Sequence, residues 1–192
     1  MRPTWFCVSS AELILRPSLD GGHCPHLAVL LRTQAELFPV LASFYALGAK
    51  RRGWLVHRSL PGEAGVDRER LAAAGLDVAP LEGNDQLAIV EFDPDESPES
   101  SPRPWRDALE QALSRGLKAL WYSRFAIGPD DDAYRNVLPF ERAWDRSFAG
   151  QPVVTLCPYV LGSLDGAATL ERLGGVSRLH DGVLVAGDDG FR

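Results

Sequence analysis

The sequence predicts an α/β domain with a mostly parallel central sheet and helices on both faces. Short apolar runs that suit buried strands alternate with amphipathic segments that suit helices, which is the pattern of βαβ units. The chain of 192 residues, with 45% hydrophobic and 24% charged residues, is long and apolar enough to bury one core. No internal repeat is visible, so residues 1–192 are interpreted as a single domain.

Strands are expected wherever a short apolar run lies between turn signals. Residues 26–31 are apolar toward both faces and predict the first core strand. Residues 5–15 predict an N-terminal extension or an edge strand within segment 1–20. Because helices separate the strands, neighbouring strands are expected to run parallel. The further strands are expected at residues 54–58, 86–92, 117–125, 151–160 and 182–187.

Helices are expected between these strands, and the first shows the clearest pattern. Leu37, Leu41 and Leu47 recur there at helical spacing. Thr33 and Glu36 form a capping-box pattern at its start, although a proline leaves the first turn undecided. The helices are expected at residues 33–48, 66–75, 105–116, 133–148 and 164–175.

Two connecting stretches are not expected to be helical. The stretch between residues 76 and 85 is expected to hold a short extended piece before the next strand. Residues 93–104, DPDESPESSPRP, are rich in proline, serine and acids, which predicts a mobile loop. Apolar periodicity resumes on both sides of this loop, so it is not interpreted as a domain boundary.

Charge and hydropathy argue against several partners. The net charge of −6 and a pI near 5.2 suit neither direct nucleic-acid binding nor an anionic membrane, since both favour a basic face. The longest nearly apolar window, residues 38–49, is too short to span a bilayer, and no secretory signal pattern is visible. Cys7, Cys24 and Cys157 are odd in number and widely spaced, which predicts a reduced, cytoplasmic protein.

The glycine motifs of the common α/β enzymes are absent from the sequence. The turn after the first core strand reads RTQAE, without the glycines and lysine of a phosphate-binding loop. No G-x-G-x-x-G or G-x-S-x-G pattern occurs. Cys157 with His180 or His57 is the one triad-like choice, but burial in an apolar strand raises the pKa of a thiol and lowers its reactivity. We therefore expect neither a bound cofactor nor an enzyme.

The stretch GGHCPHLAVLL, residues 21–31, raises the alternative of a metal site. On a strand, Cys24 and His26 would share one face and His23 would point to the other. Paired spacings such as C-x-x-C are absent, so no metal is expected, and Cys24 and His26 are interpreted as ordinary strand residues. A further ligand would have to come from Cys157, His57, His180 or an acid at another strand end.

A ligand pocket is expected where the carboxyl ends of the parallel strands meet, since open α/β sheets bind ligands in that crevice. Trp121, Tyr122 and Phe125 could form its walls. The alternative is structural, with the aromatic side chains in the core and Arg124 paired with an acid such as Glu91. The residues predicted at this edge are Arg32, Thr33, His57, Arg58, Glu91, Arg124, Cys157 and Tyr159.

Four stretches of the chain resemble the MEDS family of methanogen/methylotroph sensory domains. Residues 21–58 resemble its first strand–helix–strand unit after a Gly-x-His start, and residues 71–91 resemble its second. Residues 140–160, FERAWDRSFAGQPVVTLCPYV, resemble its helix with Glu141 and the strand ending Leu-Cys-x-Tyr. Residues 179–187 resemble its closing strand. The resemblance covers about residues 20 to 188 and is most specific at LCPY.

The chain also departs from the family pattern. Cys24 directly follows His23, whereas the family places its cysteine two residues beyond the histidine. Arg124 replaces an acid in a Gly-Glu-Met-like turn, and Val160 stands where an aspartate often follows Leu-Cys-x-Tyr. A ligand that is read through these positions could differ or be absent.

The resemblance implies a fold related to the RecA/KaiC-like ATPase core without a phosphate loop. It implies a non-enzymatic sensory domain that binds a small organic molecule, or a regulatory protein such as a kinase, an anti-sigma factor or a transcription factor, at the degenerate nucleotide site. His23 would make a functional or structural hydrogen bond, and Glu141 would anchor its helix. A nucleotide-binding, ATPase-like enzyme and a purely structural interaction domain stay open as alternatives. A homodimer is expected only by analogy with RecA-like relatives.

Overall fold

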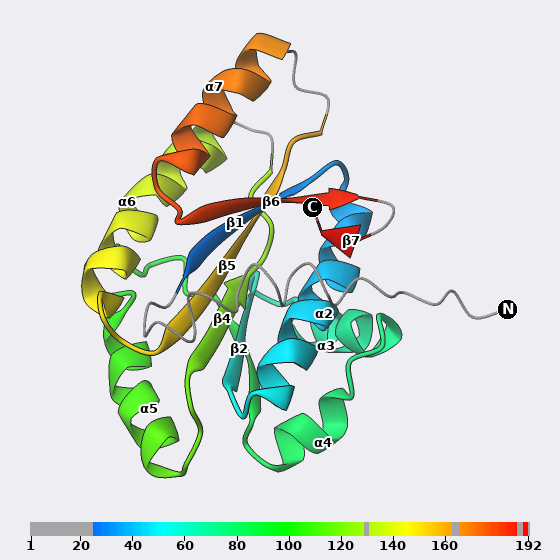
Figure 1. Cartoon of the computed structure of the whole chain (residues 1–192), viewed down its shortest axis with the longest axis vertical. Helices are drawn as coiled ribbons and strands as arrows, with labels where there is room; N and C mark the ends of the chain where they lie inside the picture. The colour runs from blue at the N-terminus through cyan, green and yellow to red at the C-terminus, as the bar shows by residue number, and fades with distance from the viewer. Residues whose placement is uncertain (1–24, 129–130, 163–165, 188–189, 192) are drawn as a thin grey trace, which may run out of the picture.

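The structure is a computed structural model that describes residues 25–128, 131–162, 166–187 and 190–191. Its centre is a seven-stranded sheet in the order β3-β2-β4-β5-β1-β6-β7 (Figure 1). Strands β1 to β6 run parallel, and β7 pairs antiparallel with β6, which confirms the predicted fold class and fits a Rossmann- or RecA-like arrangement. The strands are β1 (His26–Leu31), β2 (Trp54–Ser59), β3 (Leu87–Glu91), β4 (Leu120–Arg124), β5 (Val153–Val160), β6 (Gly182–Gly187) and β7 (Gly190–Phe191).

Helices cover both faces of this sheet, as predicted (Figure 1). One face carries α2, α3 and α4, and the other carries α5, α6 and α7. A short 3-10 helix, η1 (Gln34–Glu36), leads into α2. The helices are α2 (Leu37–Lys50), α3 (Ala64–Ala73), α4 (Val78–Gly83), α5 (Arg103–Ser114), α6 (Asp131–Phe148) and α7 (Gly166–Ser177).

The alternation of side chains along the strands divides the core into two layers. Leu55 and Trp121 point toward α2 and α3, where they join the largest apolar cluster. Val56 and Tyr122, their neighbours along the same strands, point toward α5 and α6. Strands β1, β2 and β5 are buried along their whole length, as expected for parallel strands covered on both faces.

Two local predictions are wrong: the capping box of Thr33 and Glu36, and the extended piece after residue 76. Thr33 is the N-cap of η1, as predicted, but its side chain makes no capping hydrogen bond, and the Glu36 carboxylate accepts from the backbone N and Nε of Arg32, each at 2.7 Å, so no capping box forms. Helix α2 therefore begins only at Leu37, and Pro39 fits in its first turn, where a missing N–H leaves no hydrogen bond unmade. The expected extended piece after residue 76 is instead the six-residue helix α4, whose Val78 is buried in the core.

The acid- and proline-rich stretch before α5 is a series of turns. Asp93 Oδ1 accepts from the Asp95 N–H at 2.9 Å, and the Ser97 and Ser100 side chains bond each other at 3.0 Å. Glu96 forms an ion pair with Arg58 of β2 at 3.1 Å, which ties the stretch to the sheet. The mobility of this segment stays a prediction, but its path places it as one wall of the site described below.

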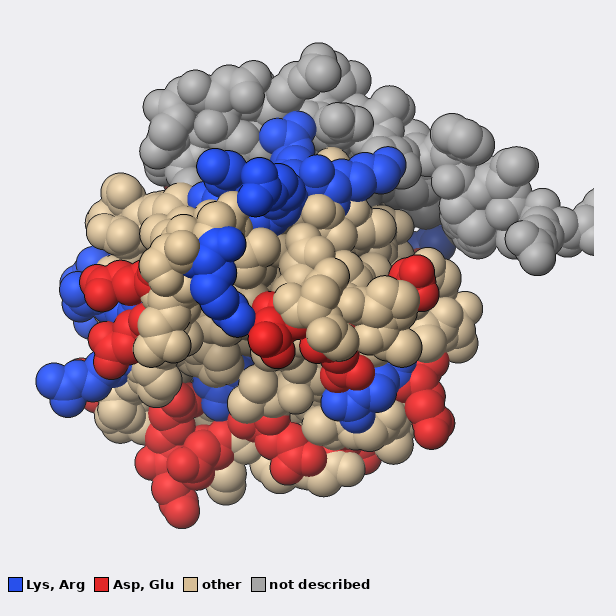
Figure 2. Space-filling view, turned by 90° about the horizontal axis from the view of Figure 1, so that it is seen from below, with Lys and Arg blue, Asp and Glu red and all other residues tan. Residues whose placement is uncertain are grey.

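The surface carries charges of both signs. On the face shown in Figure 2, Lys and Arg side chains are interspersed with Asp and Glu side chains, several of which follow the lower edge. None of the described helices combines the length and the apolar character that crossing a bilayer requires.

Candidate functional site

Five polar side chains converge around one buried carboxylate, that of Glu141 on α6. Strand β4 supplies Arg124 at its carboxyl end, and β5 supplies Cys157 and Tyr159 from the same face. His26 comes from the first residue of β1, and His180 from the turn between α7 and β6. Because side chains alternate across a strand, the register of β1 and β5 sets His26 and Cys157 on the α6 face together. These six residues are called the Glu141 cluster below.

The two oxygens of Glu141 have different partners. Oε1 accepts from a guanidinium nitrogen of Arg124 and from the hydroxyl of Tyr159 at 3.2 Å. Oε2 lies 2.9 Å from His26 Nε2 and 3.3 Å from Cys157 Sγ, and His180 Nε2 is 3.8 Å away. The Glu141 side chain is only 3% exposed. Oε1 is thus bound by the side chains of Arg124 on β4 and Tyr159 on β5, whereas Oε2 faces the two imidazoles and the thiol.

The charge on Glu141 is stabilised by its surroundings. Burial alone would raise the pKa of this carboxyl, but Arg124 and the hydrogen bond with His26 hold it well below its usual range. Burial alone would lower the pKa of Arg124, and the facing carboxylate raises it instead. Burial and the charge of Glu141 raise the pKa of Cys157 and of Tyr159. The thiol and the phenol therefore stay protonated and donate to the carboxylate.

The pKa values of the two histidines of the cluster are shifted in opposite directions. Burial alone would lower the pKa of His26, but the Cys157 sulfur and the hydrogen bond to Asp145 raise it well above its usual value. Burial and the nearby His26 ring lower the pKa of His180. The Nδ1 atoms point outward, to Asp145 Oδ1 at 2.5 Å for His26 and to the Val176 carbonyl at 2.8 Å for His180. Both Nε2 atoms consequently face the interior of the cluster.

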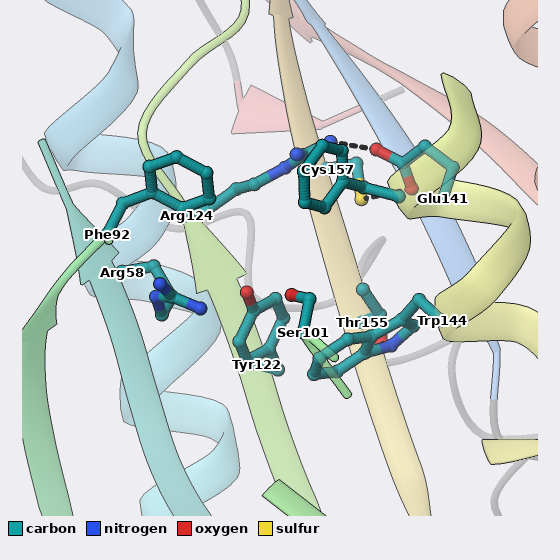
Figure 3. A pocket seen from close by; sticks show the side chains of 10 residues that line it. Arg58, Phe92, Ser101, Tyr122, Arg124, Glu141, Trp144, Thr155 and Cys157 are labelled. Atoms are coloured by element: carbon teal, nitrogen blue, oxygen red, sulfur yellow. Dashed lines mark hydrogen bonds and ion pairs between the residues drawn. The ribbon is translucent and has the colours of Figure 1, made fainter. Parts of the chain in front are cut away.

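A small cavity opens at the carboxyl ends of the strands beside this cluster (Figure 3). Its volume of about 30 Å³ holds one or two waters. Arg58 reaches into it and stacks on Phe92 and Trp105, with its Cζ atom 5.1 and 5.4 Å from the ring centroids. Among the described residues, the buried Nε of Arg58 has no hydrogen-bond partner. The lining residues are Arg58, Phe92, Ser101, Tyr122, Arg124, Phe140, Glu141, Trp144, Thr155 and Cys157.

A larger cavity, of about 230 Å³, lies on the other side of the cluster, near the first residues of β1 and β5. His26, Asp145 and Asp181 line it together with apolar residues of α6 such as Phe148. Trp144 and Thr155 line both cavities, and the indole Nε1 donates to the threonine hydroxyl at 2.8 Å. The Glu141 cluster therefore lies between two separate cavities.

The structure brings together three of the predicted ligand-binding residues. Arg124, Cys157 and Tyr159 all contact Glu141. The predicted pairing of Arg124 with Glu91 is wrong, since Arg124 pairs with Glu141. Glu91 is exposed on the edge strand β3. It lies on the same face of the strand as Leu87 and Ile89, which pack toward α2, α3 and α4, and not on the face of the cavity.

Arg58, also predicted at this edge, lines the cavity with Arg124 and Cys157. The remaining predicted site residues lie elsewhere. His57 points to the opposite face of the sheet, where it contacts Tyr45 and Asp67, so it cannot act with Cys157. Arg32 and Thr33 follow β1 at the surface, and Arg32 pairs with Glu36. His23 and Cys24 lie outside the described residues.

Sequence reasoning underestimated His26. It was interpreted as an ordinary strand residue, but its ring is buried against Glu141 and Cys157. Its i, i+2 relation to Ala28, whose register partner is Cys157, could have placed both on one face once β1 and β5 were paired. Trp121, expected as a pocket wall, packs on the opposite face, whereas Tyr122 does line the cavity.

The fold and site define a class: a parallel α/β domain with a buried polar cluster on the α6 face of its sheet. The family model described as MEDS, MEthanogen/methylotroph, DcmR Sensory domain, matches residues 25–180. The chain therefore belongs to the MEDS family of sensory domains.

A solved structure has a similar fold. It is the uncharacterized protein PH0321 from Pyrococcus horikoshii, crystallised in complex with an unknown peptide. The two share 17% sequence identity with a TM-score of 0.56, over 92% of this chain and 85% of that chain. At this identity the likeness concerns the fold alone. No curated protein matches the chain.

Proposed function

We propose that this domain is a non-enzymatic sensory module that binds a small organic molecule with an acidic or carbonyl oxygen in the cavity beside Arg58. The observation that carries the proposal is the buried Nε of Arg58, a residue that lines the cavity, because this nitrogen has no hydrogen-bond partner among the described residues. A buried donor without an acceptor costs about 1–3 kcal/mol, and a ligand oxygen would remove that cost. Membership of a sensory family supports the same role.

The walls of the cavity favour an anion or a polarised carbonyl with a small apolar part. Arg58 and Arg124 are register partners on β2 and β4, so two guanidinium groups reach the same edge of the sheet. Glu96 and Glu141 pair with their outer nitrogens. Phe92, Phe140 and Trp144 supply apolar surface, as is common in small-molecule sites.

Binding would also provide a way to transmit a signal. The cavity holds only about 30 Å³, so a ligand larger than water must displace part of its wall. Glu96 belongs to the turns before α5 and is held by Arg58. A ligand oxygen that takes over Arg58 would release Glu96 and the turns around it. We infer that a regulatory protein, such as a kinase, an anti-sigma factor or a transcription factor, detects this change.

A titration with acetate tests the proposal, with methylammonium as a probe of similar size and opposite charge. We expect acetate, and not methylammonium, to shift the NMR signals of the Trp105 and Trp144 indoles. Arg58→Gln should weaken acetate binding about 10- to 100-fold, since a hydrogen bond to a charged group contributes roughly 1.5–3 kcal/mol. Arg68→Gln is the matched control, because Arg68 pairs with Glu82 away from both cavities.

Two outcomes would overturn this function. Equal responses to acetate and methylammonium, or unchanged acetate binding by Arg58→Gln, would remove the role of Arg58. Micromolar binding of a fluorescent ATP analogue would favour the nucleotide-binding alternative, against which the missing glycines and lysine and the small cavity argue.

A further inference from the structure

Four side chains of the Glu141 cluster aim potential metal-ligating atoms at one point. They are His26 Nε2, His180 Nε2, Cys157 Sγ and Glu141 Oε2, and these atoms all lie within 4.8 Å of one another. We propose that they form a binding site for a divalent transition metal ion of the zinc class. This inference does not depend on the organic ligand proposed above, because it uses the side of Glu141 that faces away from Arg124.

The spacing of the four atoms fits a tetrahedral ion. Metal–ligand bonds of about 2.0 Å to nitrogen or oxygen and 2.3 Å to sulfur separate the ligand atoms of a tetrahedron by roughly 3.3 to 3.8 Å. Glu141 Oε2 lies 2.9 Å from His26 Nε2, 3.3 Å from Cys157 Sγ and 3.8 Å from His180 Nε2. His26 Nε2 lies 3.2 Å from the sulfur. These four distances lie within about half an ångström of the tetrahedral values, and the remaining pairs of ligand atoms, up to 4.8 Å apart, would close by about an ångström to hold an ion.

The outer partners of the two imidazoles fix the tautomer that a metal needs. Each ring directs Nδ1 to an acceptor, the Asp145 carboxylate for His26 and the Val176 carbonyl for His180. A ring that donates its Nδ1–H presents a lone pair at Nε2, and such outer hydrogen bonds are typical of metal-binding histidines. Arg124 and Tyr159 likewise hold Glu141 Oε1, which leaves Oε2 as the single ligating oxygen.

One inward-facing atom has no hydrogen-bond partner among the described residues. His180 Nε2 is buried without one, and the His180 side chain is 0% exposed. Once Cys157 and His26 lose their inward protons, the set offers two imidazole nitrogens, a carboxylate oxygen and a thiolate sulfur, each with a lone pair. A cation at their centre would satisfy all four atoms at once, including the nitrogen that otherwise lacks a partner.

Charge balance and access also suit a divalent ion. A thiolate and a carboxylate supply two negative charges, equal to the charge of the ion, and the imidazoles bind as neutral rings. On binding, the Cys157 S–H bond and the His26 Nε2–H bond break, the sulfur and the nitrogen keep their electron pairs and bond the ion, and both protons leave to solvent. The larger cavity gives a route, since His26, Asp145 and Asp181 line it and the Asp145 side chain is 43% exposed.

The competing explanation is that no ion binds and that the His26 ring carries one additional proton. Its two ring nitrogens then donate to Glu141 and to Asp145. Cobalt(II) separates the two explanations, because it is coloured in a tetrahedral site and gives a charge-transfer band with a thiolate. The experiment uses tag-free full-length chain with Cys7→Ser and Cys24→Ser, so that Cys157 is the remaining thiol. We expect one cobalt ion per chain, tetrahedral absorption, a thiolate band, and displacement of cobalt by zinc.

Variants assign the ligands. Cys157→Ser should remove the thiolate band, and His180→Gln should weaken binding more than the roughly 10- to 100-fold that loss of an outer partner costs. Asp145→Asn, which changes such an outer partner, should weaken binding within that range. His57→Gln is the matched control, a buried histidine on the opposite face of the sheet, and should leave the cobalt spectrum unchanged.

The cobalt spectrum of the chain with Cys7→Ser and Cys24→Ser, in which all four proposed ligands are intact, decides the matter even where a ligand variant fails to fold. Chain with Cys157 as its remaining thiol that stays colourless with cobalt, and whose melting temperature zinc does not raise, would overturn the proposal in favour of the proton. Octahedral cobalt without a thiolate band, or binding that Cys157→Ser and His180→Gln leave intact, would overturn it as well, because the ion would then lie elsewhere.

Discussion

The two faces of the sheet each bury a histidine beside a carboxylate, but only the histidine under α6, His180, has a buried ring nitrogen without a hydrogen-bond partner among the described residues. Under α2 and α3, His57 Nε2 contacts Asp67 Oδ2 at 3.1 Å, and His57 Nδ1 contacts the Tyr45 hydroxyl at 3.3 Å. Tyr45 in turn donates to the Val56 carbonyl at 2.9 Å. We call these residues the His57 network. Every polar atom of this network has a partner, which is how buried polar groups stabilise a fold.

Under α6, the Glu141 cluster is arranged differently. Its outer atoms are bonded to Arg124, Tyr159, Asp145 and a backbone carbonyl, while four potential metal-ligating atoms face one another, and His180 Nε2 has no hydrogen-bond partner among the described residues. Cavities flank the cluster on two sides. The contrast teaches that a buried histidine–carboxylate pair is structural when its hydrogen bonds close on themselves, and indicates a site when they point at a shared centre.

Arg124→Met should have the largest effect on stability. It leaves the buried Glu141 carboxylate without its guanidinium, and breaking a buried ion pair from one side costs about 3–5 kcal/mol. Urea denaturation should show this loss of unfolding free energy. Arg68→Met, which breaks an exposed ion pair with Glu82, should cost at most about 1 kcal/mol. Equal losses for the two variants would mean that the Glu141 cluster is not an energetic centre of the fold.

His57→Gln should have the next largest effect and should separate stability from binding. It removes the imidazole that holds Asp67, whose side chain is 7% exposed, and a buried group left unsatisfied costs about 1–3 kcal/mol. Acetate and cobalt binding should be unchanged, since His57 faces away from both cavities. A change in either binding constant, measured at a temperature where the variant is fully folded, would break the distinction between the two faces.

Two buried tyrosines provide a smaller, matched comparison. Tyr45→Phe removes a hydroxyl that donates to a neutral carbonyl, for an expected cost of about 1 kcal/mol. Tyr159→Phe removes a donor to the ionised Glu141, for which about 1.5–3 kcal/mol is expected. Thermal denaturation of the two variants measures the difference. A larger loss of stability for Tyr45→Phe than for Tyr159→Phe would contradict this prediction, because the hydrogen bond to the charged Glu141 would then be the weaker of the two.

The smallest effect concerns pH and the His57 network. Burial alone would raise the pKa of Asp67, but the hydrogen bond with His57 and the charge of nearby Arg70 lower it. A lowered folded-state pKa adds stability that is present above the unfolded value of about 3.9 and is lost as the pH falls through the folded value. Asp67→Asn should therefore flatten this part of the acid limb of a stability profile. An acid limb equally steep in Asp67→Asn would show that other carboxyls account for it.

Local sequence patterns were sufficient to predict most of the fold. The strand at residues 182–187 has the predicted bounds, and the helices expected at 66–75, 105–116 and 133–148 differ by two residues or fewer at each end. The short helix α4 was missed because its six residues are too few for a helical period, and burial of Val78 determines its conformation. The start of α2 was missed because the Glu36 carboxylate accepts from Arg32 and not from the Thr33 N–H, so the expected capping box does not form.

The site was predicted only in part. Arg124, Cys157 and Tyr159 were expected at the carboxyl ends of neighbouring strands, and they do meet. Their shared partner Glu141 was expected only to anchor its helix, and His26 was expected to be an ordinary strand residue. Neither role follows from spacing, because residues 26, 141 and 157 belong to β1, α6 and β5, and residue 180 lies in the turn before β6.

The sequence by itself determined the class of fold, because hydrophobic periodicity and turn residues act over a few residues at a time. It also determined that no phosphate loop is present, since that loop requires glycines and a lysine in one short segment. Only the tertiary structure decided which face of the sheet each histidine would take and which acid would meet which base. Those choices depend on strand order and register, which pair residues such as Ala28 and Cys157 across more than a hundred positions of chain.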